Sequence, residues 1–228
     1  MEKEILYEDN HIIIINKQAG QIVQGDKTGD IPLCEVLKQY LKEKYNKPGN
    51  VFVGVVHRLD RPVSGVLVFA KTSKALSRLN DMFKTKEAKK TYLAICANEP
   101  PKTEDTLINY LYRDEQKNKT FVRQKESKDT KTAILSYKLI DKSERYFLLE
   151  IDLQTGRHHQ IRCQLANIGC PIKGDLKYGA ARSNPDGSIS LHASKITFIH
   201  PVKKEQITIF APLPNDNLWN LFEKKLIN

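Results

Sequence analysis

The stretch His57-Arg58-Leu59-Asp60-Arg61-Pro62-Val63-Ser64-Gly65 lies between two apolar runs, residues 51–56 and 66–70. Both runs are rich in β-branched residues, which predicts two buried strands joined by a polar loop. Inside the loop a single carboxylate, Asp60, stands between two arginines. Neighbouring positive charge stabilises an ionised carboxylate and favours a nucleophile or a base. A surface ion-pair cluster has the same pattern, so the loop alone does not establish a chemistry.

A second polar segment, Leu153-Gln154-Thr155-Gly156-Arg157-His158-His159-Gln160-Ile161-Arg162, follows another predicted strand. Gly156 permits a tight turn into a helix that we expect near residues 158–168, with Gly169 placed to end it. The free N–H groups at the start of such a helix suit phosphate. Spacing alone leaves two interpretations open, an anion-binding helix start and an exposed basic one.

Short strands alternate with amphipathic helices along the rest of the chain. Helical spacing predicts helices over residues 31–45, where Asp30 is placed as a cap, after Ser73, and around Leu218 to Phe222. Residues 132–140 and 145–153 alternate like an antiparallel pair, and the remaining strands are expected at 5–7, 12–15, 91–97, 191–199 and 205–210. These elements predict one α+β domain over residues 1–228, with a mainly antiparallel mixed sheet and flanking helices.

Composition restricts the partners and the compartment. The chain has 37 Lys and Arg against 27 Asp and Glu, a net charge of +10, which favours nucleic acid or an acidic membrane surface as partner. No apolar run approaches the roughly 20 residues of a membrane span, and the polar start argues against a secretory signal. We therefore expect a cytoplasmic protein whose four scattered cysteines are reduced and mostly buried, with no structural zinc.

Taken together, the two polar segments resemble the motifs of the RluA-type pseudouridine synthases. The first supplies His57-Arg58-Leu59-Asp60 with Ser64-Gly65 and Ala70-Lys71, and Lys90-Thr91-Tyr92-Leu93-Ala94 is similar to a second motif of that family. Further similarity lies in Thr155 to Arg162 with Gly174-Asp175 and Tyr178-Gly179, in Leu191-His192-Ala193 with His200-Pro201, and in the opening Ile5 to Asp9 with Asn16-Lys17. The similar segments occur in the family's order over nearly the whole chain.

The resemblance implies a reaction and roles for named residues. Asp60 matches the essential carboxylate of an enzyme that cleaves the N1–C1′ bond of a uridine, turns the base and rejoins it through C5. Whether the carboxylate captures the sugar or takes the C2′ proton to give a glycal stays open. Tyr92 matches a tyrosine beside the base that is a candidate for removing the C5 proton, and Arg162 matches the arginine that pairs with the carboxylate. The substrate-binding candidates are His57, Arg58, Arg61, Lys71, Arg157, His159 and Gln160.

The family also implies the partner, which is structured ribosomal or transfer RNA bound in a central active-site cleft, with Arg58 helping to displace the target nucleotide. No appended N-terminal RNA-binding domain is expected, so phosphate contacts would fall to the basic surface of a monomer. Candidate lysines are Lys17, Lys71, Lys89, Lys90 and those of residues 117–131; the segment 98–131 fits an RNA-facing excursion and a solvated hairpin equally well.

Three alternatives were weighed against this enzyme. A catalytically silent RNA-binding protein on the same scaffold is disfavoured because Asp60, Tyr92 and Arg162 are all present. A glycosidase that releases free uracil differs only in the fate of the sugar. A metal enzyme using His57, His158, His159 and His192 is disfavoured, since neighbouring histidines on a helix would point apart and no acidic residue stands at ligand spacing. We therefore expect neither a metal nor any other cofactor.

Overall fold

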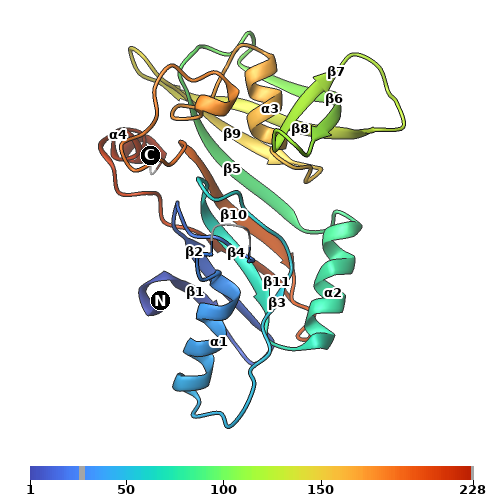
Figure 1. Cartoon of the computed structure of the whole chain (residues 1–228). Coiled ribbons are helices and arrows are strands. Elements are labelled where there is room, and N and C mark those ends of the chain that lie inside the picture. Colours follow the sequence, from blue (N-terminus) through green and yellow to red (C-terminus); the bar gives the residue numbers. More distant parts are fainter. Residues whose placement is uncertain (26–28, 227–228) are drawn as a thin grey trace. The chain divides into compact units, whose positions relative to one another are not determined.

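The computed structural model describes residues 1–25 and 29–226 (Figure 1). The chain forms two compact units, and each is described by itself. Unit 1 comprises Met1–Ala88 and Ala193–Pro212, and unit 2 comprises Lys89–His192 and the chain from Leu213 onward. Asp60 therefore belongs to unit 1, whereas Tyr92 and Arg162 belong to unit 2.

Unit 1 is organised around an antiparallel sheet whose central strands are almost entirely apolar. The strand β2 (Ile12–Lys17) carries four consecutive isoleucines, all 0% exposed, which is typical of a strand covered on both faces. Its register with β4 (Ser64–Ala70) pairs Ile12 with Ala70 and Lys17 with Gly65, so Lys17 ends beside the start of β4. The other strands of unit 1 are β1 (Ile5–Glu8), β3 (Gly54–Val55), β10 (Leu191–Ile199) from Ala193 onward, and β11 (Gln206–Phe210).

The helices of unit 1 are α1 (Leu33–Lys44) and α2 (Ser73–Lys84), after a short 3-10 turn η1 (Glu2–Glu4). The Thr72 hydroxyl accepts the Ala75 N–H and caps α2. The prediction that Asp30 caps α1 is wrong, because Pro32 occupies the N-cap position and the Asp30 carboxylate pairs with Arg61 at 2.7 Å. The predicted strand over residues 51–56 is also mostly wrong: only Gly54 and Val55 pair with β4, and Phe52 is 45% exposed.

Unit 2 contains a five-stranded antiparallel sheet in the order β5-β9-β8-β6-β7 (Figure 1). The helix α3 (Gln160–Asn167) packs on β6 and β7, and its Cys163 clusters with Leu111 of β6 and Ala133 of β8. Trp219 and Phe222 of the last helix pack against Leu93, Ile95 and Leu148 of β5 and β9. The strands are β5 (Lys89–Cys96), β6 (Glu104–Asp114), β7 (Lys119–Arg123), β8 (Thr130–Lys142) and β9 (Phe147–Leu153); the helices are α3 (Gln160–Asn167), η2 (Leu176–Tyr178) and α4 (Asn217–Leu226).

Most of the expected architecture is confirmed. The fold is α+β with mainly antiparallel strands, and the segment 98–131 contributes the hairpin β6–β7 to the sheet of unit 2. All four cysteines are buried thiols. Within the described ranges, no helix combines the length and apolar character that a bilayer crossing requires. The predicted single domain over residues 1–228 and its central cleft stay predictions.

Candidate active site

The loop that carries Asp60 is held by hydrogen bonds from a buried lysine. Lys17 is 0% exposed, and its Nζ donates to the carbonyl oxygens of Gln18 at 3.1 Å, Asp60 at 3.3 Å, Arg61 at 3.1 Å and Val63 at 2.6 Å. Burial lowers the pKa of Lys17 to about 7, against the opposing influence of the Asp60 charge. Because the carbonyls of three loop residues share one donor, the backbone around Asp60 has little freedom to move.

Other contacts fix the same loop at its two ends. The Val63 N–H donates to the Asp60 carbonyl at 3.0 Å, which closes a tight turn, and the Gly20 N–H donates to the Arg61 carbonyl at 2.8 Å. His57 accepts the Val68 N–H on Nε2 at 3.1 Å, and its ring stacks on Phe83 with centroids 4.8 Å apart. These contacts leave few alternative conformations to the backbone that carries Asp60.

The arginines of the loop and the nearby lysines differ in their exposure to solvent. Arg58 is exposed, and Arg61 forms a half-exposed pair with Asp30. Lys71 instead is 6% exposed and donates to Glu8 at 2.7 Å. Lys17 and Lys71 therefore both bind acceptors within unit 1, and their contact with phosphate stays a prediction.

Tyr92 lies on β5 of unit 2, opposite Ile151 of β9, and is 7% exposed. Two positions earlier, Lys90 is partly buried, and burial lowers its pKa although the Asp152 charge opposes the shift. Tyr92 is an interior residue of β5, and its burial limits the movement of its ring.

The polar turn before α3 combines buried and exposed residues. Gln160 is 3% exposed, and its side chain accepts the Thr155 hydroxyl at 2.8 Å and the Arg157 N–H at 3.0 Å while donating to the Ile134 carbonyl at 3.1 Å. Its side chain therefore shapes the turn. Arg157 is exposed and donates from Nε to the Thr132 carbonyl at 3.1 Å.

The two adjacent histidines do not point apart. The helix expected near residues 158–168 is confirmed and begins at Gln160, and His159 adopts the left-handed conformation with φ 51°, which brings the two imidazoles into a stack with centroids 3.7 Å apart. The geometric reason given against a metal site is therefore wrong. Among the residues that the structure describes, no three His, Cys, Asp or Glu side chains gather as a metal-binding group.

His159 is 8% exposed, and its Nδ1 lies 2.9 Å from the Tyr178 hydroxyl. Burial and the nearby Arg162 charge lower the pKa of His159 to about 2, so the imidazole is neutral. The Tyr178 oxygen already accepts the Thr120 N–H at 2.8 Å, and its own proton is directed to Nδ1. This arrangement fits the Nε2–H tautomer of His159.

Arg162 projects from the first turn of α3 and is held by an acidic partner in unit 2. Its Nε donates to Asp175 Oδ2 at 2.7 Å and its Nη2 to Asp175 Oδ1 at 2.8 Å, with both side chains buried. The Tyr178 ring lies under the guanidinium, whose central carbon is 5.1 Å from the ring centroid. Sequence reasoning assigned Asp175 and Tyr178 to a motif but gave neither a role.

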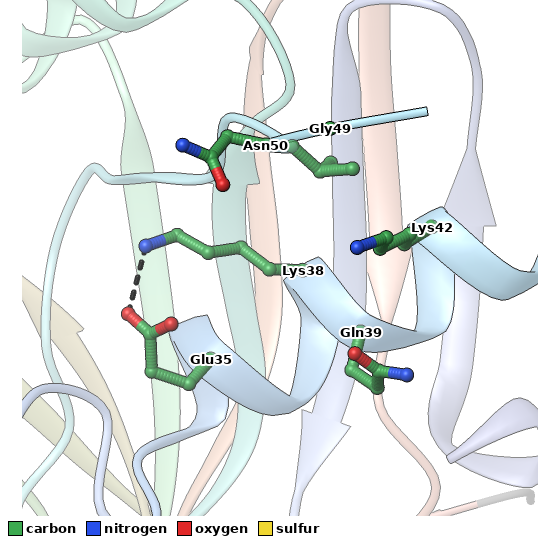
Figure 2. Close-up of a pocket in the computed structure, with 7 residues that line it drawn as sticks. Glu35, Lys38, Gln39, Lys42, Gly49 and Asn50 are labelled. Carbon is green, nitrogen blue, oxygen red and sulfur yellow. Dashed lines mark hydrogen bonds and ion pairs between the residues drawn. The ribbon is translucent and has the colours of Figure 1, made fainter. Parts of the chain in front are cut away.

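Each unit thus assembles part of the predicted set. Unit 1 presents His57, Arg58, Asp60 and Arg61 on one clamped loop, and unit 2 brings His159 and Arg162 together around Tyr178. The pairing of Arg162 with Asp60 stays a prediction. A separate open hollow of about 410 Å³ lies along α1, where Lys38 donates to Glu35 at 2.7 Å (Figure 2). None of the predicted site residues lines that hollow.

The fold and the motif loops define a class of RNA-modifying enzyme, and comparison with known proteins gives the same class. The RNA pseudouridylate synthase family model matches residues 11–167, so the chain belongs to that family and is an RNA pseudouridine synthase, an isomerase. The resemblance to the RluA type is confirmed by two relatives. The chain is 35% identical to "Ribosomal large subunit pseudouridine synthase D" of Xanthomonas campestris pv. campestris, over 93% of this chain and 66% of that protein.

The second relative is "tRNA pseudouridine synthase C" of Vibrio cholerae, 32% identical over 95% of this chain and 92% of that protein. A solved structure, "Human RNA Pseudouridylate Synthase Domain Containing 4", superposes with a TM-score of 0.79 at 22% identity. The superposition covers 99% of this chain and 92% of the human one, and it establishes a shared fold.

Proposed function

We propose that the protein isomerises specific uridines of structured transfer or ribosomal RNA to pseudouridine, with Asp60 as the catalytic carboxylate. The observation that carries the proposal is the set of hydrogen bonds from Lys17 to the carbonyls of Asp60, Arg61 and Val63, which we call the Lys17 clamp. These bonds fix the loop that contains the one acidic residue of the His-Arg-Leu-Asp motif, and family members place this loop at their reacting centre. The relatives named for transfer RNA and for ribosomal RNA supply the two substrate classes.

In this proposal Asp60 acts on the sugar while the N1–C1′ bond breaks. The freed uracil turns, the C5–C1′ bond forms, the C5 proton is removed and lost to solvent, and N1 takes up a proton from solvent in its place. Tyr92, with its ring fixed on β5, is assigned to stack on the base and to assist removal of that proton. Arg162 is assigned to keep the Asp60 carboxylate ionised. Arg58, exposed on the loop, is assigned to the space that the extruded nucleotide leaves.

The test is release of tritium from RNA labelled at C5 of uridine, comparing wild type with Asp60→Ala. Removal of a catalytic carboxylate is expected to lower the rate by at least about 10³-fold. Asp129→Ala, at an exposed position of the Lys-rich segment, is the matched control and is expected to keep the wild-type rate. Equal release by wild type and Asp60→Ala would remove Asp60 from its role.

The substrate class is separated by presenting unmodified transfer RNA and unmodified 23S-type ribosomal RNA fragments side by side, and then mapping the modified position. Release from one class, saturating at one product per molecule, assigns the substrate. No release from either class would overturn the enzymatic proposal and favour the silent RNA-binding protein. Free uracil among the products would instead indicate a glycosidase.

A further inference from the structure

Arg162 is held in a single plane by two rigid neighbours. The Asp175 carboxylate binds Nε and Nη2 with two nearly equal hydrogen bonds of 2.7 and 2.8 Å, and this side-on geometry fixes the guanidinium plane as well as its position. The Tyr178 ring lies 5.1 Å from the central carbon and limits movement out of that plane.

The backbone that carries Asp175 is itself fixed. Its N–H donates to the Ile172 carbonyl at 3.0 Å, and its carbonyl accepts the N–H groups of Tyr178 and Ala180, each at 3.0 Å. Gly174 has φ +89°, and a Cβ there would lie 2.7 Å from the Ser188 carbonyl oxygen. The carboxylate thus stands on a turn that cannot shift without disturbing its neighbours.

Tyr178 is fixed in the same way from the other side. Its hydroxyl accepts the Thr120 N–H from β7 at 2.8 Å and lies 2.9 Å from His159 Nδ1, so both of its hydrogen-bonding directions are occupied. The guanidinium therefore contacts two side chains, Asp175 and Tyr178, that are themselves fixed by further hydrogen bonds. An arginine side chain has several rotatable bonds, and these contacts reduce their freedom.

We infer that Asp175 is a positioning residue, which sets the plane of the Arg162 guanidinium and so the direction in which Nη1 points. The inference rests on the proposed role of Arg162 in the reaction. A misplacement of about 1 Å in a catalytic group lowers rates by about 10²-fold, so the precision of this pair is expected to appear in kcat and not in RNA affinity.

The test is a double-mutant cycle on single-turnover tritium release at saturating RNA, using Asp175→Asn, Arg162→Met and the double variant. Asparagine keeps the shape of the side chain but replaces one acceptor by a donor, which conflicts with the guanidinium. We expect Asp175→Asn to lower kcat by about 10- to 100-fold with KM within about threefold. If Asp175 acts through Arg162, the double variant is no slower than Arg162→Met alone.

Two outcomes would overturn the inference. A double variant whose loss equals the product of the single losses would show that Asp175 acts independently of Arg162. A wild-type rate for Arg162→Met would overturn the proposed role of Arg162 and the inference with it, and the first result would leave that role intact.

Loss of folding is separated from loss of positioning by a control of similar severity. Asp9→Asn removes a carboxylate that accepts the backbone N–H groups of His11 and Ile12, at 2.8 and 3.0 Å, in unit 1. It is expected to lower the unfolding midpoint without changing kcat of the folded fraction. A loss of kcat in Asp175→Asn that disappears after correction for the folded fraction would reduce Asp175 to a structural residue.

Discussion

Lys17 shows how one buried side chain can fix the conformation of the Asp60 loop. Its ammonium has three hydrogens for four carbonyl oxygens within 3.3 Å, and water has no access to replace them. Buried carbonyls left without a donor destabilise the fold, since each has lost its hydrogen bonds to water and gained none in return. The clamp therefore couples the stability of unit 1 to the conformation of the Asp60 backbone.

Lys17→Met tests this coupling. The substitution keeps the apolar stem but removes the donor, so we expect a loss of about 1–3 kcal/mol in the free energy of unfolding. The loop should also loosen, with kcat lowered more than KM is raised. Urea denaturation and tritium release at pH 7 measure the two effects. Lys74→Met, at an exposed position of α2, is the control; equal behaviour of the two variants would contradict the clamp.

The sequence indicated the positions of the candidate residues but not the contacts that hold their side chains. The Asp60 loop and the candidates Tyr92 and Arg162 were visible in the sequence as motif positions. The Arg162–Asp175 pair was not, because 13 residues separate its members and the intervening turn is irregular. The stack of His158 on His159 was missed because it needs φ 51° at His159, a conformation that side-chain periodicity does not indicate.

At the scale of the elements, the strand that follows the Asp60 loop depends on one glycine. Gly65 lies in β4 with φ +118°, and a Cβ there would stand 2.3 Å from the Ala193 carbonyl oxygen and 2.5 Å from the Ala193 nitrogen. Neighbouring β10 pairs with β4 at this point of the sheet. Two backbones approach so closely that no side chain fits between them.

Gly65→Ala is therefore expected to destabilise the protein by about 3 kcal/mol or more, since backbone strain and a collision with main-chain atoms add together. Gly169→Ala is the matched control. Its φ is +83°, but nothing lies within 4 Å of the new Cβ, so only the strain of about 1–2 kcal/mol remains. Thermal or urea unfolding measures the difference, and equal losses in the two variants would contradict the close approach.

Elements with strong periodicity were predicted well. The four isoleucines of β2, the alternation of β8 and β9, and the spacing of Leu33, Leu37 and Leu41 in α1 each report burial directly. The apolar run 51–56 does not form a full strand, because hydrophobicity does not distinguish a segment that pairs in a sheet from one that is only buried. Val53 is buried, Phe52 is exposed, and only Gly54 and Val55 pair with β4. Tertiary context decided that segment.

For the whole molecule, acid is expected to act in two stages, because two kinds of group have shifted pKa values. Burial lowers the pKa of His159 to about 2, so the folded protein does not take up a proton that the unfolded chain binds near pH 6.5. Its contribution to stability is complete above pH 6.5 and declines as the pH falls below it. Hydrogen bonds from Lys44 and Lys71 lower the pKa of Glu8 to about 2 despite its partial burial, and Asp9 is similarly lowered by backbone N–H groups.

These carboxylates contribute stability above their ordinary pKa values of 4.5 and 3.8, and the contribution is lost as the pH falls toward 2. Lys17, whose pKa burial lowers from 10.5 to about 7, makes stability fall with decreasing pH only above about pH 7. Below that value the free energy of unfolding should fall from near pH 6.5 and more steeply below pH 4.5. Each such group adds a slope of up to about 1.4 kcal/mol per pH unit.

Urea denaturation from pH 8 to pH 3, with His159→Gln beside the wild type, isolates the first stage. The glutamine cannot titrate, so its stability should change less between pH 6.5 and 4.5 and should decline like the wild type below that range. An unchanged slope in the upper range would show that His159 accepts its proton in the folded protein, and that the neutral imidazole inferred from its contact with Tyr178 is wrong.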